Sequence, residues 1–200
     1  MWVIAGPNGA GKSSFANQFL SDLGQGDLVK LNADERTLKL RGDFPDAEPN
    51  DLNLRAAIEI DKEVESCIDA GRSFIVETVL SSPKYRDDVL AAKLKGFTFG
   101  LIYISLYPPR LSPQRVSERV AKGGHAVDAE KAIERYLRSH EELRWFAPRA
   151  DLFMAFDNSD SDGNPVLLAS RVNGRPLHYI HPGINPAIDL ALSGMSFVGT

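Results

Sequence analysis

The pattern of apolar and polar residues switches repeatedly between two periods along the chain. Short apolar runs typical of strands lie at 2–5, 28–31, 73–76, 97–106 and 151–156. Segments whose apolar residues recur at helical spacing lie at 12–23, 35–40, 51–70, 83–95, 112–121 and 128–146. Such alternation predicts parallel βαβ units with right-handed crossovers. The predicted fold class is therefore α/β, with a mostly parallel sheet between layers of helices.

The last forty residues depart from this alternation. Two short apolar segments, 166–172 and 177–180, flank Asn173-Gly174, which is a strong signal for a β-hairpin. A short terminal helix is predicted after the hairpin. We therefore predict a main domain over residues 1–158 and a C-terminal hairpin and helix, residues 159–200, packed on that same domain.

A glycine-rich stretch joins the first predicted strand to the first predicted helix. It reads Gly6-Pro7-Asn8-Gly9-Ala10-Gly11-Lys12-Ser13, a complete G-x-x-x-x-G-K-S loop, and Ser14 follows it. The glycines permit a tight path that points N–H groups at phosphate oxygens, and the next helix adds its positive dipole end. Lys12 is expected to reach the β- and γ-phosphates, and Ser13 to ligate Mg²⁺. The sequence therefore predicts a P-loop NTPase fold.

Two carboxylates come just after predicted strands. Asp34 follows the strand at 28–31, and Glu77, with Thr78, directly follows the strand at 73–76. Residues just past the carboxyl ends of strands in an α/β sheet point into the ligand crevice. For Asp34, an N-cap of the following helix is an equally good interpretation.

Arginines are concentrated in the two helices after the longest apolar run. Arg115 and Arg119 lie one turn apart on the first helix, which Gly123-Gly124 ends, and Arg135 and Arg138 lie off the apolar stripe of the second. That stripe is predicted to consist of Ile133, Tyr136, Leu137, His140 and Leu143. Each arginine by itself is best interpreted as part of a solvated face that pairs with nearby acids. Near a P-loop, the group could instead form a phosphate clamp.

Composition narrows the class of partner. Two hundred residues suit one α/β domain, and the net charge of −4 disfavours a general nucleic-acid surface and favours a small-molecule substrate. The single cysteine, Cys67, lies in a helical pattern, so we expect a buried thiol and no internal disulfide. No apolar run is long enough to span a membrane and no secretory leader is visible, which predicts a cytoplasmic protein. The four histidines lack the spacing of zinc ligands.

The order of these features resembles the zeta-toxin family of P-loop small-molecule kinases. The resemblance covers roughly residues 1–158, and four pieces carry it: Gly6–Ser14, Leu31–Asp34, Val76–Thr78, and Arg115–His125 with its continuation Ile133–Ser139. The arginine, Gly-Gly-His and Arg-Tyr-x-Arg-Ser elements of the last piece are the most specific. A P-loop alone is shared by many NTPases.

The resemblance implies a role for each matching residue. Asp34 corresponds to the family's general base on a sugar hydroxyl, and Glu77, beside Thr78, to the residue that helps to hold the substrate or the magnesium shell. Arg119, in a helical lid at about 110–128, and Arg135 correspond to the phosphate clamp.

This chain departs from the family at two positions near the clamp. It has Asp128 where the family usually has proline and Glu134 where the family often has arginine. The choice between Arg135 and Arg138 as the second clamp residue therefore stays open.

The implied activity is transfer of the γ-phosphate of ATP or GTP, with Mg²⁺, to a hydroxyl of a small molecule. The family's best-known substrate is UDP-N-acetylglucosamine, a nucleotide sugar phosphorylated on its 3′-hydroxyl. A role as a bacterial toxin and an antitoxin protein as partner belong to the same resemblance. The segment from Val166 onward lies outside the part that can be matched.

Three other functions share one or more of these features. An ABC-type ATPase can begin with the same loop, but its signature is only faintly echoed at 192–195, and no strand ending in Asp-Glu can follow. A regulatory module that holds nucleotide without turnover is disfavoured by the intact Lys12, Ser13 and Asp34. A kinase of a nucleoside, an antibiotic or an RNA end remains a serious alternative, although the acidic composition disfavours RNA.

Overall fold

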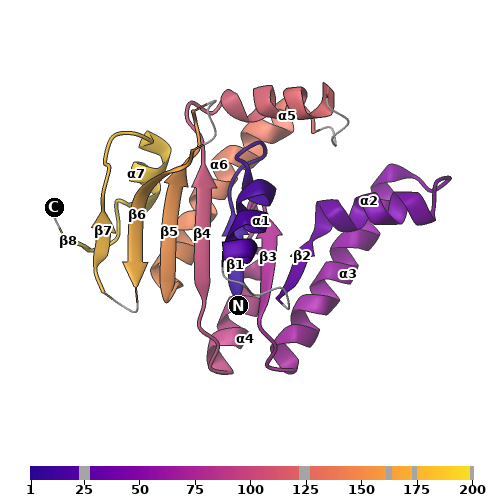
Figure 1. Ribbon diagram of the computed structural model, residues 1–200, viewed down its shortest axis with the longest axis horizontal. Helices are drawn as coiled ribbons and strands as arrows, with labels where there is room; N and C mark the ends of the chain where they lie inside the picture. The colour runs from indigo at the N-terminus through magenta and orange to yellow at the C-terminus, as the bar shows by residue number, and fades with distance from the viewer. Residues whose placement is uncertain (23–27, 122–126, 161–163, 173–174, 199–200) are drawn as a thin grey trace.

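The computed structural model describes residues 1–22, 28–121, 127–160, 164–172 and 175–198. Its strands form one eight-stranded sheet in the order β2-β3-β1-β4-β5-β6-β7-β8 (Figure 1). The parallel part consists of β1 (Trp2–Ala5), β2 (Val29–Asn32), β3 (Phe74–Thr78), β4 (Gly100–Ser105) and β5 (Leu152–Asp157). The rest consists of β6 (Val166–Val172), β7 (Leu177–Tyr179) and β8 (Phe197–Val198).

The predicted fold class and the C-terminal hairpin are confirmed. β6 runs antiparallel to β5, and β7 antiparallel to β6. The predicted turn at Asn173-Gly174 lies outside the described residues. β8 pairs parallel with β7 and was not predicted, because two residues are too short to produce a periodic pattern.

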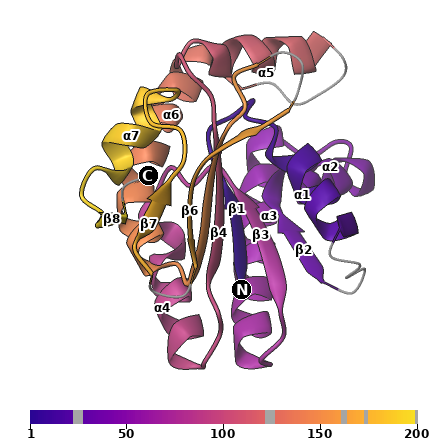
Figure 2. The same ribbon diagram turned by 60° about the vertical axis from the view of Figure 1, so that its left-hand side comes forward.

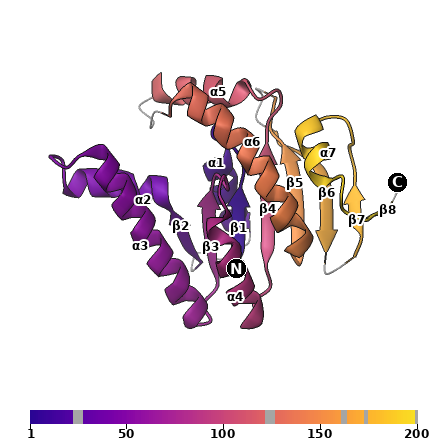
Figure 3. The same cartoon turned by 180° about the vertical axis from the view of Figure 1, so that it is seen from behind.

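Seven α-helices and two short 3₁₀ turns surround the described sheet. The α-helices are α1 (Lys12–Asp22), α2 (Ala33–Asp43), α3 (Pro49–Asp69), α4 (Arg86–Leu94), α5 (Leu111–Ala121), α6 (Ala129–Phe146) and α7 (Pro186–Leu192), and the turns are Pro83–Tyr85 and Ala147–Arg149. α1 covers one face of the sheet, whereas α3, α4, α6 and α7 lie on the other face (Figures 1 and 3).

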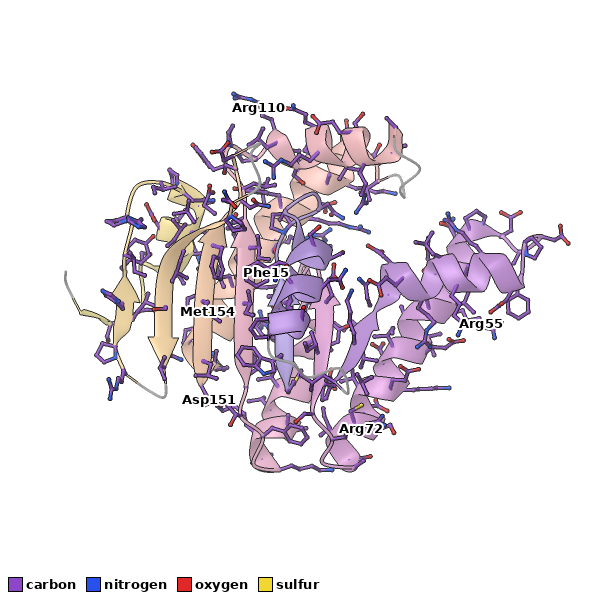
Figure 4. The ribbon with its side chains drawn as sticks, viewed as in Figure 1. Phe15, Arg55, Arg72, Arg110, Asp151 and Met154 are labelled. Carbon is purple, nitrogen blue, oxygen red and sulfur yellow. The ribbon has the colours of Figure 1, made fainter. Side chains whose placement is uncertain are left out.

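α5 lies across the ends of the central strands (Figure 2). In Figure 4, Arg110, just before α5, and Asp151, just before β5, lie at opposite ends of the sheet. β5 starts next to Asp151, so α5 covers the carboxyl ends of the parallel strands. This is the edge at which α/β proteins bind ligands.

Alternation along the strands gives the sheet two apolar layers. On the α1 side, Ile4 and its neighbours pack with Phe15, whose ring centroid lies 5.0 Å from that of Phe156. Phe15 of α1 and Met154 of β5 are seen on this face in Figure 4. On the other side, Val3 and Ala5 join the larger core, which also contains the buried thiol of Cys67, as predicted.

The predicted core face of α6 is confirmed in part: Tyr136, His140 and Leu143 are buried, whereas Ile133 is only partly buried and Leu137 is exposed. Its buried residues are Ala132, Tyr136, Ser139, His140, Glu142, Leu143 and Phe146. Leu137 was expected on this face but is 57% exposed. Ser139 and His140 lie inside because their polar atoms find partners there, so the helix turns a polar pair inward and a leucine outward.

Side chains cap two helices near the site. Asp128 caps α6 by accepting a hydrogen bond from the N–H of Lys131 at 3.0 Å. Asp34 is not an N-cap: it lies in the first turn of α2, and Asn32 accepts hydrogen bonds from the N–H groups of Asp34 and Glu35.

Among the described residues, no helix is both long enough and apolar enough to cross a bilayer.

Candidate active site

The P-loop adopts a backbone path that only glycine accommodates easily. Gly9 and Gly11 have φ of +77° and +87°, in the left-handed region that side chains disfavour. At Gly6 a β-carbon would overlap the backbone carbonyl oxygen of Ile104 on β4. The three glycines therefore let the loop turn tightly and pack against the sheet at the same time, as the sequence predicted.

Two segments distant in sequence hold the P-loop in place. The Ser112 hydroxyl, in the first turn of α5, donates to the Asn8 carbonyl oxygen at 2.7 Å. The Asn158 side-chain amide, just after β5, donates to the Ala10 carbonyl oxygen at 2.9 Å. Sequence reasoning missed both residues, because no local pattern marks a contact between residues more than 100 positions apart.

Lys12 is the charged centre of the site. Its ammonium group donates to the Pro7 carbonyl oxygen at 3.0 Å. Burial lowers the pKa of Lys12, and so does the charge of Arg119, whereas the carboxylates of Glu77 and Asp34 act in the opposite direction. Three of the residues predicted to act with Lys12, namely Glu77, Asp34 and Arg119, are thus close enough to influence its pKa.

Glu77 lies between the Ser13 hydroxyl, at the end of the P-loop, and the Lys30 ammonium, on the edge strand β2. Its Oε1 accepts from the Ser13 hydroxyl at 2.6 Å. Its Oε2 is buried and accepts no hydrogen bond from a described residue, although the Lys30 ammonium is 3.7 Å away. That distance is an ion pair and too long for a hydrogen bond. Lys30, on β2, also contacts Glu35 and Asn17, and sequence reasoning did not single it out.

A cavity of about 200 Å³ opens beside Lys12 at the carboxyl ends of β2 and β3. Asp34, Glu77, Thr78 and Arg135 line it together with Lys12, and its other lining residues are Asn32, Ala33, Val79, Leu80, Ser81, Ser82, Lys84 and Tyr85. β2, β3 and β1 are neighbours in the sheet, so residues that follow them meet at one edge. Five residues chosen from sequence therefore share one polar cavity.

The arginines divide into three groups. Arg135 lines the cavity, whereas Arg138 faces outward and forms an exposed ion pair with Glu134 at 3.2 Å. Arg119 does not line the cavity but lies on α5, where its charge acts on Lys12. Gly123-Gly124, the predicted end of the helix that carries Arg119, lies outside the described residues.

Arg115 does not belong to a solvated face, and that expectation is wrong. Its guanidinium donates to three consecutive backbone carbonyls, those of Asn158, Ser159 and Asp160, at 2.6, 3.0 and 2.8 Å. Arg115 therefore fastens α5 to the loop after β5. A planar guanidinium suits this task, because its fixed fork of N–H groups can serve several acceptors at once.

A buried polar network fixes α6 beneath the site. In the neutral His140 ring, Nδ1 donates to the Tyr136 carbonyl oxygen at 2.8 Å, so Nε2 accepts from the Ser105 hydroxyl at 2.9 Å. Burial lowers the pKa of His140 to about 4. Ser139 donates to the carbonyl oxygen of Val79, which lines the cavity, at 2.6 Å. The helix that carries Arg135 is thereby tied to the cavity wall.

The sheet order and the glycine-rich loop together define a domain of the P-loop NTPase fold. A family model described as an AAA domain matches residues 1–143, and the chain belongs to this family. No curated protein matches the chain.

Several solved structures share the fold. A chain of the native AvrRxo1-ORF1:AvrRxo1-ORF2 complex superposes with a TM-score of 0.71 at 16% identity, covering 96% of this chain and 64% of that one. The same complex with ATP gives 0.67 at 17% identity, covering 86% and 58%. A chain of the PezAT toxin–antitoxin system of Streptococcus pneumoniae gives 0.56 at 16% identity, covering 83% and 70%. Our chain thus spans less than two thirds of the AvrRxo1 chains, and such identities show a common fold only.

Proposed function

We propose that this chain is a phosphotransferase that moves the γ-phosphate of ATP or GTP to a hydroxyl of a small molecule, with a nucleotide sugar such as UDP-N-acetylglucosamine as the leading acceptor. The observation that carries the proposal is the cavity beside the P-loop, lined jointly by Lys12, Asp34, Glu77 and Arg135. Binding a nucleotide needs only the P-loop. A carboxylate and a second cation around an adjoining cavity are what transfer to an acceptor requires.

The donor site fits a triphosphate and a magnesium ion. The backbone of Gly6 to Ser14 would cradle the phosphates, with the Lys12 ammonium against the β- and γ-phosphates. Ser13 and Glu77 offer hard oxygen ligands, and the buried Glu77 Oε2 is left without a hydrogen bond by the described residues. Ser13 and Glu77 would hold Mg²⁺ there, and the ion would supply positive charge against the negative charge that develops during transfer.

Asn32, and not Asp34, is the N-cap of α2, so the Asp34 carboxylate is available to interact with the acceptor hydroxyl. In the proposed reaction Asp34 takes the proton of the attacking hydroxyl. The hydroxyl oxygen forms a bond to the γ-phosphorus as the bond to the bridging oxygen of the nucleoside diphosphate breaks. Lys12 and Arg135, joined by Arg119 from α5, stabilise the negative charge on the transferring group.

The relatives support this class of activity. One of the AvrRxo1 structures contains ATP, and a putative kinase from Chloroflexus aurantiacus superposes with a TM-score of 0.52 at 18% identity, covering 69% of this chain and 77% of that one. The PezAT structure is of a toxin–antitoxin system. A cytoplasmic toxin held by an antitoxin is therefore part of the proposal, and a nucleoside or an antibiotic is the alternative acceptor.

The test is a phosphotransfer screen over nucleotide sugars, nucleosides and antibiotics, with ATP or GTP as donor and mass spectrometry of the products. We expect a product heavier by one phosphate. Asp34→Asn should cut turnover by about 10²–10⁴-fold, the range for a positioned general base, with nearly unchanged nucleotide affinity. Asp43→Asn, at the far end of the same helix, is the matched control and should keep normal turnover. Nucleotide hydrolysis without any phosphorylated acceptor, or full turnover in Asp34→Asn, would contradict the proposal.

A further inference from the structure

Asn185 lies outside the family match, in the C-terminal unit that we define as β6, β7 and α7. Its side chain is fully buried. The side-chain oxygen caps α7 by accepting from the N–H of Ile188 at 3.3 Å. The side-chain amide donates instead to Oδ1 of Asp157, the last residue of β5, at 2.7 Å. Asn185 therefore has a second contact that capping does not require.

Asp157 connects Asn185 to the loop that follows β5. Only 6% of Asp157 is exposed, and its carboxylate also accepts from the Ser159 hydroxyl at 2.7 Å and from the Ser159 N–H at 3.0 Å. Burying a carboxylate costs free energy unless hydrogen-bond donors surround it. The three hydrogen bonds to Asp157 are therefore coupled, because the loss of one weakens the positioning of the others. Without the Asn185 amide, Oδ1 of Asp157 would lose one of its two hydrogen-bond donors, and the Asp157 carboxylate would position Ser159 less firmly.

We call Asn158–Asp160 the post-β5 loop, and it touches the donor site on two sides. Asn158 donates to the carbonyl oxygen of Ala10 in the P-loop, and a β-carbon on Gly11 would collide with the Asn158 amide. The three carbonyls of the loop hold Arg115 of α5. Ser159 also accepts from the N–H of Tyr107, where the chain turns toward α5.

We propose that Asn185 is a positioning residue for the donor site: it orients Asp157 and, through the post-β5 loop, sets the P-loop and the helix that carries Arg119. The proposal rests on the proposed function insofar as the P-loop is a phosphate site. According to this proposal, the C-terminal unit contributes to phosphate binding as well as adding strands to the sheet. Hydrogen bonds between named atoms join Asn185 to Asp157, Asp157 to Ser159, and the post-β5 loop to the P-loop and to Arg115, and the backbone of the loop connects them. Energetic coupling between sites is carried by contiguous networks of this kind.

The experiment uses Asn185→Ser in the full chain. Serine retains a good N-cap oxygen for α7 but cannot supply the amide donor to Asp157. The matched control is Ile188→Val, which removes one buried methylene from the same helix but keeps the Ile188 N–H that Asn185 caps and the Asn185 amide that donates to Asp157. Melting temperatures show how far each variant destabilises the C-terminal unit.

Two readouts separate positioning from general stability. Hydrogen–deuterium exchange is measured for peptides that cover residues 6–13 and 106–115. Affinity for inorganic tripolyphosphate is measured by calorimetry. We expect Asn185→Ser to raise exchange in both peptides and to weaken tripolyphosphate binding about 2- to 30-fold, the range of couplings carried by packed networks. Ile188→Val should change neither the exchange nor the affinity, even where it lowers the melting temperature as much as Asn185→Ser does.

Equal effects of the two variants, or unchanged exchange and affinity in Asn185→Ser, would overturn the proposal. If Asn185→Ser does not fold, Ser159→Ala breaks the next contact of the path and is held to the same expectations. Neither readout needs an acceptor. A failed acceptor screen would therefore count against the proposed function alone, and unaltered exchange in an active enzyme would count against Asn185 alone.

Discussion

Replacing His140 should change how the stability of this protein depends on pH. Burial holds the pKa of His140 at about 4 in the folded chain, against an ordinary value of 6.5. The unfolded chain therefore binds the proton more tightly. The stability that comes from keeping the ring neutral is fully present above pH 6.5 and is lost as pH falls toward 4.

The size of the effect follows from the difference in pKa. Each unit corresponds to about 1.4 kcal/mol, so the full loss below pH 4 is about 3 kcal/mol, and at pH 5 about 2 kcal/mol has been lost. His140→Gln keeps an amide in place of the ring and cannot be protonated. We expect its free energy of unfolding to fall less than that of the parent between pH 7.5 and pH 5, by about 2 kcal/mol.

The assay is urea unfolding at both pH values, followed by circular dichroism. The difference between the two proteins is needed because Asp88 acts in the opposite direction. Burial, together with the charges of Asp61, Glu65 and Asp87, raises the pKa of Asp88 to about 6. Its contribution to stability therefore grows as pH falls, in both proteins alike. Parallel pH profiles for the parent and His140→Gln would refute the reasoning, because the ring would then titrate equally in both states.

Three further predictions concern the candidate site. Lys12→Ala should abolish transfer and strongly weaken triphosphate binding in calorimetry, and undiminished turnover would make the loop purely structural. Arg135→Ala should lower kcat by orders of magnitude while Arg138→Ala, whose exposed ion pair is worth less than about 1 kcal/mol, stays near normal; equal losses would contradict the cavity assignment. Arg119→Ala should reduce kcat by about 10³–10⁵-fold with little change in melting temperature, and Arg119→Lys should recover only part of it. Normal turnover in Arg119→Ala would leave α5 without a catalytic role.

Local signals in the sequence predicted most of the sheet and much of the site. The P-loop is defined by spacing within eight residues, and Asp34 and Glu77 were found because strand ends can be located from apolar runs. The sheet order then brought these residues to one edge. Each of these inferences needed only neighbours along the chain and a general rule for parallel sheets.

The contacts that hold the site together could not be predicted in the same way. Arg115 has no sequence feature that distinguishes it from a surface arginine, and its partners are backbone carbonyls about 45 residues away. Leu137 was placed in the core because it follows the helical spacing, whereas Ser139, which was not predicted there, lies inside and forms hydrogen bonds with groups of other elements. Long-range polar satisfaction decided these positions, and periodicity carries no information about it.

The position of β4 has a practical consequence for anyone who would cut this chain at the end of its family match. All six residues of β4 are buried, and each pairs with a residue of β5, which begins nine positions after residue 143. A fragment ending at 143 would present a flat row of unpaired amides and carbonyls flanked by apolar side chains, which is the surface from which strands add to one another between molecules. We therefore expect a soluble fragment to include at least β5, which lies beyond the segment that the family model matches.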